Sequence, residues 1–281
     1  MSKQGKAALF AFLGGLIWSF TGLFSKLVSW SSFTLVGLRA LVAVVILAAY
    51  RRSFRIRPNK GMWIGAAGVT LTSVLYLSAI RLTTTANAIV LQYTASVFVI
   101  LYMFLVRHQK PLRSEMIGAA FVILGVCLCF SDGLRGGNLL GNILGLLSGA
   151  SYAVVFLSAR YSGNDPVDNV YFGTLVSCVF ALAAPFDPAV KITWGQMGVL
   201  LALGSGLGLG YLFFSLGIRY GLSAIRSCII SNVEPVMNPI WVFLAMGERP
   251  GLRSILGAAV VLLAVTLQSV YEARKNGQTG G

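Results

Sequence analysis

Charge is scarce in this sequence, and negative charge is scarcest. Asp and Glu together number 8 against 22 Lys and Arg, and charged residues make up 11% of the 281 residues. Soluble domains carry roughly 25%. There is a single histidine, His108, in a basic segment. With so few acids and imidazoles outside the loops, the sequence offers no set of metal ligands and no acid–base pair for catalysis. No metal and no cofactor are expected.

Cysteine is also sparse and does not indicate a disulfide framework. The four cysteines all lie within apolar runs, at Cys127, Cys129, Cys178 and Cys228. Two of them are only two residues apart, which points their side chains to different faces of a helix. Neither a disulfide scaffold nor a metal site is therefore expected.

Apolar residues dominate the chain instead. They make up 57% of it, and the mean hydropathy is +0.81. The formal charge of +14 sits in short clusters between apolar runs, not on a basic face with interleaved aromatics, so nucleic acid is not an expected partner. The sequence predicts an integral membrane protein with the lipid bilayer as its surroundings.

Ten apolar segments are long enough to cross a bilayer, which takes roughly 20 residues each. They are predicted at residues 6–28, 32–50, 61–81, 84–106, 114–131, 138–161, 167–185, 195–219, 223–246 and 252–271. We therefore predict an all-α, polytopic membrane protein with ten transmembrane helices and short connections.

The basic residues set the predicted orientation. With the N-terminus inside, the first cytoplasmic loop holds five Lys and Arg residues between 51 and 60, and the next loop inside holds three between 107 and 113. Fewer fall in the loops predicted outside, and the positive-inside rule then places both termini in the cytoplasm.

The two halves of the chain resemble each other. "MIGAAFVILGV" at 116–126 aligns without a gap to "ILGAAVVLLAV" at 255–265, and more than half of the positions are identical. The same register pairs Pro111 with Pro250, and a separate alignment at the front of each half pairs Trp18 with Tyr152. We interpret residues 1–134 and 135–281 as two five-span repeats. Because five is odd, the copies cross the membrane in opposite directions, as in the 5+5 inverted-topology repeats of secondary transporters.

These features together resemble a known family. The glycine-led "GAA" of both halves, "QYTASVFVILYMFL" near 84–106, and the "GE" of Gly247 and Glu248 are similar to the EamA-type family of the drug/metabolite transporter superfamily. The resemblance implies a carrier of the bacterial inner membrane, often an exporter of amino acids or other metabolites, with a cavity between the helices. The first half departs from the family at Ser96, where a proline is common, and at "RHQ" in place of "GE".

The segment "SNVEPVMNPI", residues 231–240, holds the most unusual residues. Ser231, Glu234 and Asn238 share one helical stripe, and an acid at this depth needs a partner or a wet cavity. Pro235 and Pro239 are expected to free backbone carbonyls. We interpret Glu234 as a substrate-binding residue and a candidate for proton coupling. The alternative is a structural ion pair with Arg39 or Arg226. For Arg39, as for the prolines, we favour a gating or structural role.

The remaining candidate substrate-binding residues are polar or aromatic side chains within predicted spans. Amides and hydroxyls can bind a polar solute or join helices, while aromatic rings can face a cation or pack against neighbouring helices. Besides Ser231, Glu234 and Asn238, the candidates are Trp18, Tyr76, Gln92, Tyr93, Ser96, Tyr152 and Tyr211.

The sequence thus predicts a secondary transporter, not an enzyme. It would move a small metabolite, such as an amino acid or amine, by alternating access and outward across the bacterial inner membrane, as a monomer or dimer. The alternatives are a lipid-handling protein such as a flippase, or a structural membrane subunit. A membrane-embedded enzyme fits less well, because no nucleophile and base are found together within the spans.

Overall fold

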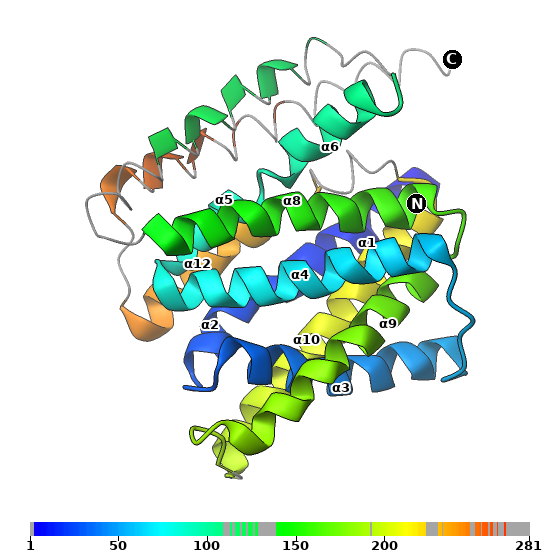
Figure 1. Cartoon of the computed structure of the whole chain (residues 1–281). Coiled ribbons are helices and arrows are strands. Elements are labelled where there is room, and N and C mark those ends of the chain that lie inside the picture. Colours follow the sequence, from blue (N-terminus) through cyan, green and yellow to red (C-terminus); the bar gives the residue numbers. More distant parts are fainter. Residues whose placement is uncertain are drawn as a thin grey trace.

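The described part of the chain is built from helices alone. The computed structural model describes residues 3–108, 139–191, 193–222, 230–231 and 233–247, with scattered positions between 113 and 128 and between 251 and 267. Within these ranges there is no strand (Figure 1). The helices are α1 (Lys3–Trp18), α2 (Thr21–Lys26), α3 (Ser32–Arg51), α4 (Lys60–Leu82), α5 (Thr85–Gln92), α6 (Ala95–Leu105), α8 (Leu139–Tyr161), α9 (Pro166–Ser177), the 3₁₀ helix η1 (Cys178–Phe186), α10 (Trp194–Arg219) and α12 (Val233–Met246).

Capping side chains define where most of the long helices begin. An oxygen of the N-cap residue accepts a hydrogen bond from a backbone N–H of the first turn in α3, α4, α5, α9 and α10, where the caps are Ser31, Asn59, Thr84, Asp165 and Thr193. These short polar side chains satisfy amides that would otherwise lack a partner. Polar residues between apolar runs therefore set the helix boundaries.

Seven helical segments are long and apolar enough to cross a membrane, counting only the described residues. They confirm the spans predicted at 6–28, 32–50, 61–81, 84–106, 138–161, 167–185 and 195–219. The spans predicted at 114–131 and 252–271 fall largely outside the described residues, and α12 covers only the second half of the one predicted at 223–246. The ten-span arrangement stays a prediction.

Large apolar side chains remain exposed on the outer faces of these helices. Val45 on α3 is 57% exposed, and Ile64 and Leu71 on α4 are 60% and 50% exposed. Water would disfavour this exposure, whereas acyl chains match it. The length of the segments and their apolar outer surface make this a multi-pass membrane protein.

Two of the membrane-spanning segments are interrupted near their middle. The first bends between Trp18 and Thr21, and the fourth between Gln92 and Ala95. At the first bend the Ser19 hydroxyl donates to the Leu16 carbonyl at 2.6 Å, and Trp241 of α12 donates to the same hydroxyl at 3.0 Å. Irregular backbone inside a membrane is tolerated where protein or a cavity surrounds it. Both bends border the cavity described below.

Helices distant in sequence pack side by side around this interior. α4 lies along α8 and α9, α1 along α10, and α5 along α8 (Figure 1). Glycines permit the closest approaches. A Cβ atom at Gly210 of α10 would overlap the Trp18 indole nitrogen, and one at Gly22 of α2 would overlap the Asn238 carboxamide oxygen. The small residues thereby bring α10 and α12 up to the first span.

Candidate functional site

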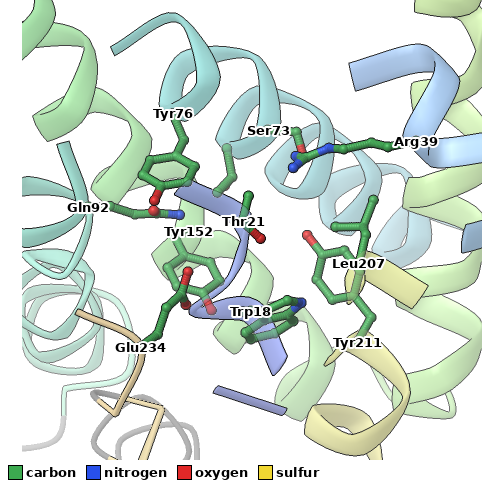
Figure 2. Close-up of a pocket in the computed structure, with 11 residues that line it drawn as sticks. Trp18, Thr21, Arg39, Ser73, Tyr76, Gln92, Tyr152, Leu207, Tyr211 and Glu234 are labelled. Atoms are coloured by element: carbon green, nitrogen blue, oxygen red, sulfur yellow. The ribbon is translucent and has the colours of Figure 1, made fainter. Parts of the chain in front are cut away.

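A polar cavity lies among the helices in the interior of the protein. Its free volume is ≈ 40 Å³, room for water-sized molecules and well below the roughly 300–1,000 Å³ of open small-molecule sites. Side chains from seven helices, α1, α2, α3, α4, α5, α8 and α10, meet there with Glu234 of α12 (Figure 2). The lining residues are Trp18, Thr21, Arg39, Thr72, Ser73, Tyr76, Gln92, Tyr152, Leu207, Tyr211 and Glu234.

The start of α12 positions Glu234. Pro235 lies in the first turn of this helix, where a missing N–H costs no helical hydrogen bond. Pro235 therefore lies at a helix start, and α12 continues through Pro239. Because Pro235 has no N–H to donate, the Ser231 carbonyl accepts instead from the Tyr93 hydroxyl at 2.7 Å and from the Glu234 N–H at 3.0 Å.

Tyr93 binds the Glu234 side chain as well as the backbone before it. Its hydroxyl lies 2.7 Å from Glu234 Oε2. Tyr93 is 1% and Glu234 5% exposed, so the contact is shielded from solvent outside the cavity. A phenol that donates to a carboxylate makes a charge-assisted bond, which is stronger than one between neutral groups.

A second hydrogen bond joins the next turn of α12 to α4. Asn238 Nδ2 donates to the Tyr76 hydroxyl at 3.1 Å, and both side chains are buried. Asn238 therefore orients a tyrosine of the cavity wall. Together with the Tyr93 contact, it ties α12 to both α4 and the bend of the fourth span.

Arg39 is the other charged residue of the cavity. It reaches the cavity from α3, and its side chain is 3% exposed. Arg39 and Glu234 extend toward the cavity from opposite sides (Figure 2) and do not form an ion pair. The alternative of an Arg39–Glu234 ion pair is thus absent among the described residues, and the other named partner, Arg226, lies outside them.

Several buried polar atoms of the cavity wall have no hydrogen-bond partner within the described protein. They are Trp18 Nε1, Arg39 Nε, Thr72 Oγ1 and Gln92 Oε1. Burying one such group without a partner costs about 1–3 kcal/mol, and buried polar groups normally find one. Four of them around one cavity indicate a site for a polar solute.

Aromatic rings form a continuous wall beside these polar groups. The Trp18 ring meets Tyr211 edge-on, with centroids 5.1 Å apart, and meets Tyr152 at 6.2 Å. Tyr152 in turn meets Tyr93 at 6.1 Å. Perpendicular packing of this kind is favourable for the ring quadrupoles. The faces of such rings can receive a cation.

Most of the predicted site residues come together in this place. Six of the ten line the cavity, namely Trp18, Tyr76, Gln92, Tyr152, Tyr211 and Glu234, while Tyr93 and Asn238 support the lining from behind. Ser231 takes part through its carbonyl. Ser96 does not line the cavity, because its hydroxyl turns back to the Tyr93 carbonyl at 3.2 Å.

Four lining residues were not predicted from the sequence. Thr21 follows the bend of the first span, Leu207 lies one turn before Tyr211, and Thr72 and Ser73 lie one turn before Tyr76. The spacing of Ser73 and Tyr76 at i and i+3 was a usable signal, since it puts both on one face of α4. No group of three His, Cys, Asp or Glu side chains gathers as a metal site among the described residues.

A multi-pass helical protein whose interior gathers an acid, an arginine and unpartnered polar groups around one cavity belongs to the class of membrane transporters. Comparison with known sequences agrees. The profile of the EamA-like transporter family matches residues 5–131 and again 139–270, so the chain belongs to that family.

Several curated relatives are named as transporters. An uncharacterized transporter of Archaeoglobus fulgidus is 25% identical over 96% of this chain and 99% of its own. A pseudopaline exporter, CntI, of Pseudomonas aeruginosa is 28% identical over 68% of each chain. A crystal structure that covers 95% of this chain and 98% of its own superposes with a TM-score of 0.71 at 17% identity, which shows the shared fold.

Proposed function

We propose that this protein is a secondary carrier that exports a small amino-acid-like or amine-like metabolite by alternating access. The observation that carries the proposal is the set of unpartnered polar atoms around the central cavity. A purely structural interior would satisfy them, whereas a transport site leaves them for the solute. The name of the Pseudomonas relative, an exporter, supports the outward direction.

Alternating access is supported by the organisation of the chain. The family profile matches twice, once in each half, which supports two repeats at residues 1–134 and 135–281. If these are inverted copies, exchanging their conformations converts an inward-open cavity into an outward-open one. This scheme includes ten spans with both termini in the cytoplasm of a bacterial cell.

Counterflow in liposomes tests the proposal. Purified protein is first screened by thermal shift against amino acids and amines, because a ligand of the native state raises the unfolding temperature. The stabilising compounds are then loaded into proteoliposomes, and uptake of a labelled trace of the same compound is followed. A carrier takes up the trace faster when the lumen is preloaded, whereas a channel does not. Uptake equal to that of protein-free liposomes for every stabilising compound would contradict the proposal.

A further inference from the structure

Arg39 holds a buried positive charge that makes no direct contact with an acid among the described residues, and Glu234 attracts it only from across the cavity. Its guanidinium makes no hydrogen bond and no ion pair with any described residue, although it is only 3% exposed. A guanidinium carries five N–H donors in a planar fork, and a buried charge without a partner is costly. The donors reach the cavity instead, so a partner of negative charge fits there.

The cavity wall presents one charge of each sign. Of the residues that line it, only Arg39 and Glu234 are charged, and they face each other across the space (Figure 2). The carboxylate of Glu234 already accepts one hydrogen bond, from Tyr93. A solute with a single charge would match one of these residues and leave the other unmatched, whereas a solute with both charges matches both.

We propose that Arg39 is an anion-binding subsite and that the transported solute is a zwitterion, with its carboxylate at Arg39 and its amine at Glu234. This assignment rests on the proposed carrier function and specifies its substrate class. The fork of Arg39 suits a carboxylate, which it can bind through two parallel hydrogen bonds. Thr72, whose Oγ1 has no partner in the described protein, lines the same cavity and offers a further hydroxyl.

The competing explanation is a structural one, in which water links Arg39 to Glu234 and neither residue discriminates among solutes. The two explanations differ in what they predict for compounds that carry only one of the two charges. Under the structural explanation, an amine binds as tightly as the corresponding amino acid.

Three matched series test the proposal on the wild-type protein. Each contains a zwitterion, the amine without its carboxylate and the acid without its amine. They are leucine, isoamylamine and isocaproate; phenylalanine, phenethylamine and hydrocinnamate; and ε-aminocaproate, hexylamine and caproate. Binding to protein in nanodiscs is measured by calorimetry and thermal shift. We expect at least one zwitterion to bind roughly 10- to 100-fold more tightly than both of its analogues, as the loss of a charge-assisted contact implies.

Variants then test which residue is responsible for the preference for the zwitterion over its singly charged analogues. Arg39→Gln should make the zwitterion and the amine bind equally, and Arg39→Lys should keep part of the tighter binding of the zwitterion. Arg55→Gln removes an exposed guanidinium from a loop and should leave both affinities unchanged. If an Arg39 variant does not fold, the wild-type comparison still decides the matter. Amines that bind as tightly as the zwitterions, or no zwitterion binding at all, would overturn the subsite. Counterflow of another solute class in the same preparation would leave the carrier function standing while the zwitterion assignment falls.

Discussion

The Tyr93 hydroxyl lies 2.7 Å from Glu234 Oε2 and 2.7 Å from the Ser231 carbonyl oxygen. A phenol has one proton, so it donates to only one of these two acceptors at a time. The same tyrosine therefore connects the bend of the fourth span to the one acid of the cavity and to the Ser231 carbonyl, whose usual donor four residues later is missing because that residue is Pro235. Opening the cavity along this boundary would require breaking that contact.

Replacing Tyr93 with phenylalanine tests how much this contact contributes. The variant removes the one proton that serves either Glu234 Oε2 or the Ser231 carbonyl, so one buried hydrogen bond is lost and we expect the protein to lose about 1–3 kcal/mol of stability. Thermal unfolding of the detergent-purified protein measures the change. Tyr220→Phe is the matched control, because it removes a hydroxyl from a partly exposed ring at the end of α10. Equal melting of the two variants would show that the Tyr93 hydrogen bond contributes no net stability.

Glu234 is the expected site of proton coupling. If it carries the proton, Glu234→Gln should abolish the response of transport to an imposed pH gradient, since glutamine keeps the shape but cannot titrate. Counterflow should weaken, because the amine contact is lost, but persist at a raised substrate concentration. Proteoliposomes with and without a gradient give both readings from one preparation. A variant that still follows the gradient would place coupling elsewhere, and loss of counterflow alone would assign Glu234 to substrate binding.

Asp187 links the loop after η1 to the start of α3, outside the spans. Burial raises the pKa of its carboxyl, but hydrogen bonds from the Ser31 N–H at 2.7 Å, the Thr34 hydroxyl and the Ala189 N–H outweigh it, so the pKa lies below its ordinary 3.8. A carboxyl whose pKa is lowered in the folded state contributes its full stabilisation when the pH is above its ordinary pKa. This stabilisation is lost as the pH falls through the lower pKa of the folded state.

The difference in unfolding temperature between the wild type and Asp187→Asn should depend on pH in this way. We expect the wild type to unfold at a higher temperature than the variant near neutral pH, and the two unfolding temperatures to become equal below about pH 4. Asp168→Asn, which instead breaks the contact of α9 with Arg51, serves as a control for general effects of removing an acid. A gap that persists unchanged at low pH would mean that the Asp187 contacts do not depend on its charge.

The sequence predicted the spans well because hydropathy and short polar caps depend on local composition. Glu234, Tyr76 and Gln92 were found for a related reason: polar groups are rare within apolar spans, so each stands out. Arg39 stood out equally, but only the structure places its guanidinium opposite Glu234, because that relation depends on how α3 and α12 pack. The bends at Trp18 and Gln92 were missed, since no proline marks either one and tertiary contacts stabilise them.

The close contact between Gly210 of α10 and Trp18 of α1 gives the last prediction. A Cβ atom at Gly210 would overlap the Trp18 indole nitrogen, whereas one at Gly206, a turn earlier on α10, would have its nearest neighbour 3.9 Å away, on Ile17. Alanine in a helix interior is favoured over glycine by roughly 0.5–1 kcal/mol. Gly206→Ala should therefore raise the unfolding temperature or leave it unchanged.

Gly210→Ala should lower the unfolding temperature, because the added methyl group must displace Trp18 or separate α10 from α1, and overpacking costs about 1–3 kcal/mol. Since Trp18 lines the cavity, the same variant should weaken substrate binding, which Gly206→Ala should not. Thermal unfolding and the intrinsic fluorescence of the tryptophans compare the two directly. If both variants unfold at the same temperature and bind substrate with the same affinity, α10 and α1 do not pack as closely in solution as this contact requires.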